Sequence, residues 1–257
     1  LQVLQMLDCF APVADSTVEY WHRWAEVLKL AWRDRLRYIG DPDFVEVPIE
    51  RLLSCDYAAG RVEGLKQRPE RVDLESWGLS SQTVPETLQL SAADAEGNVV
   101  AATITQGGNL GSGVVVAGTG VVLNHGMNRL DPRPGGANSV APYKRPLNNT
   151  APMIVRLPDR DVATGLPGGR RIIAVGAQLA QRVIDFAASP QAAAEATRLH
   201  VVVEEPLEVR PDMDENLVAG LKKMGHRIKR NNNIGGMAHI AEYLREEQKT
   251  SAGGGGW

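Results

Sequence analysis

Apolar residues between positions 16 and 37 recur every three or four residues, which predicts an amphipathic helix. Tyr20 and Trp24 belong to the apolar stripe, and Ser16 and Glu19 have the spacing of a capping box at its start. The stretch GDPDF then interrupts this spacing, and VPIERLLS predicts a second, short helix with a proline near its first turn. The first part of the chain is therefore expected to be mainly helical.

Residues 66–86 show no steady period and mix charged residues with serine, glycine and proline, which is typical of an exposed linker. After this segment, apolar and polar residues alternate. TLQLSAAD and VVAATITQ predict two strands joined by a hairpin with Gly97 and Asn98 in its turn. GSGVVV (111–116) and GTGVVLN (118–124) predict two more strands.

The rest of the chain predicts further strands and three helices. TAPMIVRLPDRDVATGLPGG predicts a pair of strands, RRIIAVGAQLAQRVIDF a long helix, PQAAAEATR a second helix, LHVVVEE a strand, and MDENLVAGLKKMG a third helix. The tail SAGGGGW is expected to be flexible up to its tryptophan. Helices, paired strands, helices and a returning strand, in this order, favour an α+β fold in which helices cover antiparallel sheet.

Composition excludes some functions. The 257 residues include 28 basic and 31 acidic side chains, so the chain lacks the positive charge with which proteins bind nucleic acid. No apolar run approaches the roughly 20 residues of a membrane span. Cys9 and Cys55 are expected to be buried as small apolar side chains. His22, His125 and His200 are scattered along the chain, so no metal site is predicted.

Two glycine-rich segments were considered as anion-binding sites. Residues 106–113, QGGNLGSG, lack both the Lys-Ser/Thr ending of a phosphate-binding loop and the spacing GxGxxG, which favours a close approach of two strands instead. Gly168 and Gly169 stand where the long helix is predicted to begin, and the backbone N–H groups of a helix start are unpaired. These two amides could hold a developing oxyanion, although a simple strand-to-helix turn explains the glycines equally well.

Thr87 is a candidate nucleophile. A threonine hydroxyl needs a base to take its proton, and the α-amine of the same residue becomes that base when the preceding peptide bond is cut. An α-amine has a pKa of about 7.7–8.0 and is therefore partly neutral at physiological pH. The predicted linker directly before Thr87 would be the place of the cut. By local pattern alone, Thr87 also suits an ordinary strand.

Several segments resemble, in order, the γ-glutamyltranspeptidase family of N-terminal-nucleophile (Ntn) hydrolases, whose precursors cut themselves into a large and a small subunit. DRLRYIGDPDFVEVP (34–48) is similar to the end of the large subunit, and TLQLSAADAEGNVVAAT (87–103) to the start of the small subunit. GSGVVVAGTGVVLN, APYKRPLNNTAPMIV, GLPGGRRII, VIDF and GGGGW follow in the family's order. NNNIGG (231–236) has the pattern of a loop, and the resemblance implies a position near the active-site side. The resemblance implies a four-layer αββα sandwich, incomplete at the N-terminus of this chain.

The resemblance assigns catalytic roles to a few residues. Thr87 matches the nucleophile, which is released by a cut between Glu86 and Thr87. Gly168 and Gly169 match the pair that holds the oxyanion, and Thr105 matches a threonine whose hydroxyl supports the nucleophile. The implied reaction is attack of the Thr87 hydroxyl on an amide carbonyl and release of the acyl group to water or to an amine. It requires no cofactor.

The substrate pocket departs from the family pattern. The substituted positions there are Gly107, Gly126, Asn128, Arg129, Asn148 and Asn149. Asn148 and Asn149 stand where the family has two serines that hold a substrate carboxylate, and Leu88 and Gln89 replace a threonine and a histidine. Arg129 lies where the family places a glutamine and two acids that bind the glutamyl α-amine. Because an arginine repels an ammonium group, we expect an acyl group that bears a carboxylate or a carbonyl there.

The resemblance also divides the chain. Residues 1–86 match the C-terminal, mainly helical part of the large subunit with its linker, and residues 87–257 match the small, catalytic subunit. The expected partners are the preceding part of the large subunit and a small amide or γ-glutamyl-type substrate. The family implies a periplasmic or extracellular location, with any signal upstream of this chain. The alternatives are an acylase acting on oxamate or β-lactam side chains, and a catalytically silent homologue that serves as a binding or scaffold protein.

Overall fold

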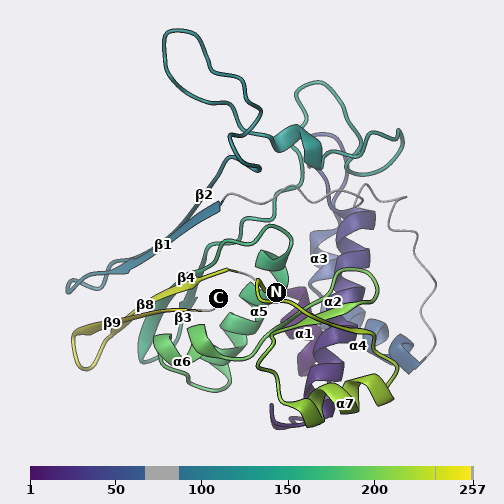
Figure 1. The fold of residues 1–257 in the computed structure, drawn as a ribbon, viewed down its shortest axis with the longest axis vertical. Coiled ribbons are helices and arrows are strands. Elements are labelled where there is room, and N and C mark those ends of the chain that lie inside the picture. Colours follow the sequence, from purple (N-terminus) through teal and green to yellow (C-terminus); the bar gives the residue numbers. More distant parts are fainter. Residues whose placement is uncertain (67–86, 235, 256–257) are drawn as a thin grey trace.

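A computed structural model describes residues 1–66, 87–234 and 236–255 (Figure 1). The first part is helical, as the sequence predicts. Its elements are α1 (Gln2–Asp8), α2 (Val18–Tyr38), α3 (Ile49–Leu52), α4 (Cys55–Glu63) and the 3₁₀ turn η1 (Gly64–Lys66). The predicted linker, apart from its first residue, lies outside the described residues.

Helix α2 begins at a different cap from the one predicted. Thr17 is its N-cap, and the Thr17 hydroxyl accepts a hydrogen bond from the Tyr20 N–H at 3.3 Å. The predicted capping box of Ser16 and Glu19 is therefore wrong, and Glu19 instead pairs with Arg23 at 2.8 Å. Serine and threonine are both good caps, so the sequence does not decide between two neighbouring hydroxyl residues.

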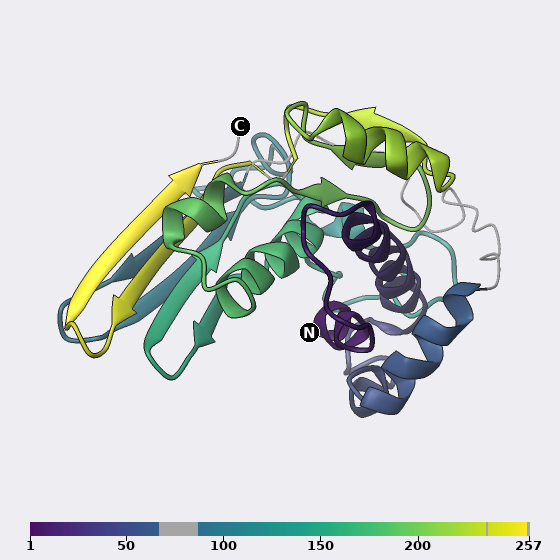
Figure 2. The same ribbon diagram turned by 90° about the horizontal axis from the view of Figure 1, so that it is seen from below.

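Two antiparallel sheets lie one upon the other (Figures 1 and 2). The first is the predicted hairpin of β1 (Thr87–Ala93) and β2 (Val99–Thr105). The second has the order β3-β4-β8-β9, formed by β3 (Met153–Arg156), β4 (Arg160–Gly165), β8 (Ala238–Leu244) and β9 (Lys249–Gly255). A hydrogen bond of 2.9 Å from the Ser91 hydroxyl to the His239 carbonyl joins the two sheets.

Helices cover the other face of the four-stranded sheet. α5 (Arg171–Ile184) and α6 (Pro190–Glu195) pack against it, opposite the β1–β2 hairpin (Figure 2). All six residues of β4 are buried, as expected of a strand that is covered on both faces. Apolar side chains of β4, β8, α5 and α6 form one core. The described residues thus supply a hairpin layer, a sheet layer and a helix layer, which confirms the α+β class.

A second core joins the beginning and the later part of the chain. A small sheet of β5 (Leu199–His200), β6 (Leu207–Val209) and β7 (Ile228–Arg230) packs with α7 (Glu215–Lys223) against α2. The fully buried side chains of Trp24 and Leu28 on α2 lie in this core with those of Leu199 and Leu207. Helices from residues 1–66 therefore share one core with residues 199–228. β6 and β7 are parallel, an exception to the expected antiparallel pairing.

Three predicted strand regions differ from the structure. GSGVVV and GTGVVLN do not form strands. An isolated antiparallel β-bridge between Val115 and Val122 connects the two segments. Here Gly111 has a φ of 55°, and a side chain at this position would overlap the Leu123 carbonyl. The close backbone approach predicted for residues 106–113 is thus present at Gly111, but the segments that approach each other are irregular and not strands. In LHVVVEE, only Leu199–His200 is a strand.

The glycine-rich tail SAGGGGW was expected to be flexible, but residues 249–255 form a strand, so the expectation is wrong for residues 251–255. This strand, β9, pairs with β8 along its whole length. The physical reason is the packing of α6 upon β9, since a side chain at Gly253 would overlap the backbone of Gln191. Glycine is needed here for close contact rather than for flexibility.

The two cysteines are free and exposed, which corrects the expectation that both are buried. Cys9 is the C-cap residue of α1, and Cys55 is the first residue of α4, so both stand at helix ends on the surface. Among the described helices, none combines the length and the apolar character needed to cross a membrane.

Candidate active site

The structure brings the predicted nucleophile and its supporting threonine together. Thr87 begins β1 and stands opposite Thr105, the last residue of β2, in the register of the hairpin. The Thr87 hydroxyl donates a hydrogen bond to Thr105 Oγ1 at 3.1 Å. The Gly107 N–H donates to the same Thr105 oxygen at 2.9 Å. The backbone therefore orients the hydroxyl that contacts Thr87.

Thr87 lies on the wall of a cavity of about 970 Å³ that Gly168 also lines. Gly168 and Gly169 precede α5 and have φ values of 143° and 61°, which glycine adopts without steric cost. Their carbonyls accept hydrogen bonds from the Arg171 and Ile172 N–H groups in the first turn of the helix. Within the described residues, no hydrogen bond uses the N–H of either glycine. The cavity thus brings the candidate nucleophile Thr87 near a helix start, where backbone N–H groups are available as donors.

Other residues of this cavity were not predicted from the sequence. Among them are Arg171, Arg210, Asp212 and His239. Arg171 forms an ion pair with Glu208 at 2.9 Å and Arg210 one with Asp212 at 2.7 Å, so acids in the described part neutralise both arginines. A single histidine in an apolar strand gives no sequence signal, and His239 enters the site through the pairing of β8 with β4.

The loop that was expected to face the site does so. In NNNIGG (231–236), three residues line the same cavity as Thr87, namely Asn232, Asn233 and Gly236. Gly236 packs closely against Pro167, next to the candidate oxyanion glycines. The family order of motifs therefore placed this segment well, although its local pattern indicates only a loop.

The predicted substrate residues form a second cluster. Arg129 Nη1 donates to Asn148 Oδ1 at 2.6 Å. Arg35, on α2, donates to the Asn148 carbonyl at 2.7 Å and to Asn149 Oδ1 at 3.2 Å. Arg35 was not predicted as a site residue, although it lies in the motif DRLRY. We refer to the four connected residues as the arginine cluster, namely Arg35, Arg129, Asn148 and Asn149.

The arginine cluster is electrically unbalanced. In the part of the chain that the structure describes, neither Arg35 nor Arg129 forms an ion pair with a carboxylate. Burial lowers the pKa of Arg35 to about 10, and the nearby charge of Arg129 contributes to this shift. Burial also lowers the pKa of Arg129. With a pKa near 10, the Arg35 side chain is charged at neutral pH. The cluster therefore carries positive charge that no acidic residue in the described part of the chain neutralises.

A short chain of contacts links Thr87 to the arginine cluster, although the cluster does not line the Thr87 cavity. Beyond Thr105, a Cβ at Gly107 would lie 3.4 Å from His125. The His125 N–H donates to the Gln106 carbonyl at 2.6 Å, and Asn128 Nδ2 is 3.4 Å from His125 Nδ1. Asn128 and Arg129 both belong to the 3₁₀ turn η3 (Gly126–Arg129). The residues predicted to bind the substrate thus lie to one side of Thr87 and do not surround it.

The motif GDPDF holds the segment that contains Asn148 and Asn149. Asp41 Oδ1 accepts from Arg145 Nη2 at 2.6 Å, and Asp41 Oδ2 accepts from the Arg145 N–H at 2.7 Å. The Arg145 side chain and backbone hold the pKa of the Asp41 carboxyl well below its usual range. The motif in the predicted large-subunit part therefore fixes the position of the arginine cluster.

Thr87 starts a strand, contacts the hydroxyl of Thr105 and faces the start of a helix. On two stacked antiparallel sheets, this is the arrangement of an N-terminal-nucleophile hydrolase. Glu86, the other residue of the predicted cut, lies outside the described residues. The family can be stated from a comparison with known proteins. The chain belongs to the γ-glutamyltranspeptidase family, whose model, described as "Gamma-glutamyltranspeptidase", matches residues 1–254.

Relatives of two kinds match the chain. "Acylase ACY 1 proenzyme" of Pseudomonas sp. (strain V22) is 38% identical over 245 residues, which are 94% of this chain and 43% of the relative. "Glutathione hydrolase proenzyme" of Bacillus subtilis subsp. natto is 32% identical over 248 residues, which cover 89% of this chain and 42% of the relative. The chain thus spans less than half the length of these curated relatives.

A solved structure confirms the fold over nearly the whole chain. Cephalosporin acylase from Bacillus halodurans superposes with a TM-score of 0.77 and 24% identity, over 99% of this chain and 46% of that chain. At this level of identity the similarity concerns the fold alone, and it agrees with the α+β fold expected from the sequence.

Proposed function

We propose that this chain supplies the nucleophile of a self-processing amidohydrolase or acyltransferase, which cuts its own backbone between Glu86 and Thr87. The hydrogen bond between the Thr87 and Thr105 hydroxyls, in a cavity that Gly168 also lines, supports this proposal most directly. The division of the chain at residue 86 into large-subunit and small-subunit parts belongs to the same proposal.

The proposed reaction proceeds in two steps. The α-amine of Thr87 takes the hydroxyl proton while Oγ1 attacks the amide carbonyl, and the Gly168 and Gly169 N–H groups stabilise the oxyanion. The C–N bond breaks, and the leaving amine receives the proton. Water or an amine then attacks the acyl-enzyme ester and releases the acyl group, which restores the Thr87 hydroxyl. The residues present suffice for these steps.

The arginine cluster favours an acyl group with a carboxylate and without an ammonium group. Arg35 and Arg129 present positive charge that no described acid neutralises. A charge-assisted hydrogen bond stabilises a bound carboxylate by about 1.5–3 kcal/mol, a factor of about 10 to 150 in binding. An α-ammonium group next to Arg129 would be repelled instead. The substrate class proposed is therefore the monoamide of a dicarboxylic acid, closer to an acylase substrate than to a γ-glutamyl compound.

Two p-nitroanilides test this proposal because they differ only in the α-ammonium group. We expect the mature protein to hydrolyse glutaryl-p-nitroanilide with a kcat/KM about tenfold or more above that for γ-glutamyl-p-nitroanilide. Arg129→Gln should lower kcat/KM for the glutaryl compound and remove the preference. Arg133→Gln is the matched control, since Arg133 lies in the same loop and pairs with Asp131.

Two outcomes would contradict the proposal in different ways. Faster hydrolysis of the γ-glutamyl compound would refute the acyl specificity and leave the catalytic threonine standing. Absence of hydrolysis of both compounds, together with an uncut chain, would favour the silent homologue. Thr87→Ala and Thr87→Ser separate these cases, because only the serine variant retains a hydroxyl nucleophile.

A further inference from the structure

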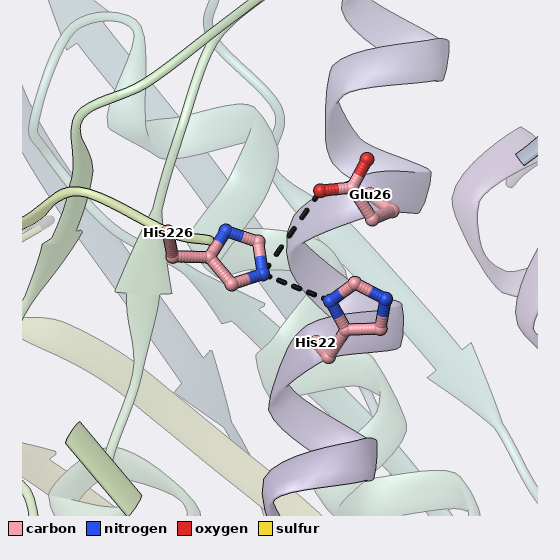
Figure 3. A group of neighbouring side chains, drawn as sticks. All are labelled: His22, Glu26 and His226. Atoms are coloured by element: carbon pink, nitrogen blue, oxygen red, sulfur yellow. Dashed lines mark hydrogen bonds and ion pairs between the residues drawn. The ribbon is translucent and has the colours of Figure 1, made fainter. Parts of the chain in front are cut away.

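Three side chains with metal-binding atoms meet on the side of the molecule where α2 packs against the segment between α7 and β7 (Figure 3). His22 and Glu26 lie one turn apart on α2 and therefore project from the same face of this helix. His226 follows α7 and points toward both. His22 Nδ1 is 2.9 Å from His226 Nε2, and His226 Nε2 is 4.0 Å from Glu26 Oε1.

We propose that His22, Glu26 and His226 bind a divalent first-row transition-metal ion such as Zn²⁺. The ligand atoms of the three residues all lie within 4.8 Å of one another. Two imidazole nitrogens and one carboxylate oxygen are a ligand set that suits zinc and its neighbours in the first transition row. No local pattern indicates this site, because His226 is 204 positions away from His22.

Small side-chain movements would give these atoms the required geometry. Zinc binds nitrogen at about 2.0–2.1 Å and carboxylate oxygen at about 2.0–2.2 Å, so ligand atoms in a tetrahedral site are about 3.3 Å apart. The two nitrogens, now at 2.9 Å, would have to separate slightly, and the oxygen at 4.0 Å would have to approach. Rotations of the side chains provide such changes without a shift of the backbone.

Glu205 orients the buried histidine for this role. His226 Nδ1 lies 2.7 Å from Glu205 Oε1, so the proton on Nδ1 is held by the carboxylate and the lone pair on Nε2 faces His22 and Glu26. This carboxylate–histidine arrangement is typical of zinc ligands.

The local charge also favours a cation. Lys29 Nζ donates to Glu26 Oε1 at 2.6 Å and to Glu205 Oε1 at 2.7 Å. Glu26, Glu205 and Lys29 thus place two carboxylates and one ammonium beside the two histidines. Glu26 Oε1, which lies 4.0 Å from His226 Nε2, is also the oxygen that Lys29 contacts, so the Lys29 ammonium would have to move aside for this oxygen to bind the ion. Glu19 and Arg23, on the same helix, neutralise each other.

The site is open on one side. His22 and Glu26 line a cavity of about 640 Å³, which gives an ion an entry path and leaves room for a water or another ligand in the fourth position. His226 closes the opposite side because it is buried. A bound ion would fasten α2 to β7, and β7 leads directly to Asn232 and Asn233 in the wall of the Thr87 cavity. The ion would thereby stabilise that wall without taking part in the reaction.

Titration with Co²⁺ tests the proposal, because its visible spectrum reports the number and type of ligands. We expect the purified protein to bind one Co²⁺, displaced by one Zn²⁺, with a spectrum of nitrogen and oxygen coordination. His22→Gln should weaken the binding by roughly 100-fold or more, since it removes a ligand. Glu19→Gln is the matched control, because Glu19 lines the same cavity but pairs with Arg23.

His22→Gln is the decisive variant because His22 is only half-buried, so circular dichroism is expected to show a folded protein. Unchanged Co²⁺ affinity and spectrum in folded His22→Gln would overturn the proposal, as would a wild-type protein that binds no Co²⁺. Zn²⁺ should also raise the Tm of the wild type and of Glu19→Gln but not that of His22→Gln. None of these measurements depends on amide hydrolysis, so the metal site and the proposed function fail or stand separately.

Discussion

Among the described residues, the hydrogen bond to Thr105 orients the Thr87 hydroxyl. Thr105 Oγ1 accepts from Thr87 on one side and from the Gly107 N–H on the other. The resemblance to the family implied both threonines as site residues, and the register of the hairpin places them opposite each other. Arg35 and His239 escaped prediction, since each reaches its cluster from an element distant in sequence. Neither has a local pattern that differs from that of an ordinary helix or strand residue.

Replacing the supporting hydroxyl tests this residue-scale geometry. Thr105→Val keeps the shape of the side chain but removes the hydrogen bond to Thr87, which is worth about 0.5–1.5 kcal/mol. We expect kcat to fall by roughly threefold to tenfold and self-cleavage to slow by a similar factor. Thr105→Ser, which keeps the hydroxyl, should stay close to the wild type. Wild-type rates in Thr105→Val would show that the hydroxyl pair has no catalytic role.

At the scale of elements, long segments with a steady period were predictable and glycine-rich ones were not. The helices around Trp24 and Val175 and the β1–β2 hairpin follow from apolar spacing alone. The prediction for the tail was wrong because glycine occurs both in flexible segments and where two backbones pack closely. At Gly253 the cause is the backbone of Gln191 on α6, which no local pattern records.

Two neighbouring glycines of β9 therefore differ in their tolerance of a methyl group. A Cβ at Gly253 would overlap the Gln191 backbone, whereas a Cβ at Gly254 would lie 3.4 Å from the Ala238 carbonyl. We expect Gly253→Ala to lower the free energy of unfolding by about 1–3 kcal/mol and Gly254→Ala to change it by clearly less. Urea denaturation of both variants measures the difference. Equal stability would refute the packing of α6 against β9.

At the scale of the whole molecule, one face of the first sheet has no cover among the described residues. Leu88 and Leu90 of β1 and Val100 and Ile104 of β2 are 71%, 57%, 49% and 67% exposed. Leu88 stands opposite Ile104 in the hairpin, so their side chains share a face. A monomeric protein rarely leaves such a patch in water, which indicates an interface. The relatives are more than twice as long as the matched region, so we propose that the preceding part of the large subunit covers it.

Hydrogen exchange can test this proposed cover. We expect the amides of β1 and β2 to exchange more slowly when the chain is produced together with the preceding segment than when it is produced alone. Leu90→Lys should weaken the association of the two parts, because it places a charge in an apolar interface. The control is Met127→Lys, because Met127 is 72% exposed. Unchanged exchange and unchanged association would refute the interface.

The cut before Thr87 would not separate the two parts of this chain. α2 and α7 share one buried core with β5 and β6, so residues before and after the cut stay packed together. This shared core could not be predicted from the sequence, because it joins side chains that are more than 150 positions apart. The cut then frees the α-amine of Thr87 at low cost to the structure.

The identity of the first residue of the mature catalytic subunit tests the central claim most directly. N-terminal sequencing and intact mass spectrometry of the active protein, produced with its natural preceding segment, should show a polypeptide that begins Thr-Leu-Gln-Leu, and Thr87→Ala should remain a single chain. A fully active protein in which Thr87 is still joined to Glu86 would contradict the account.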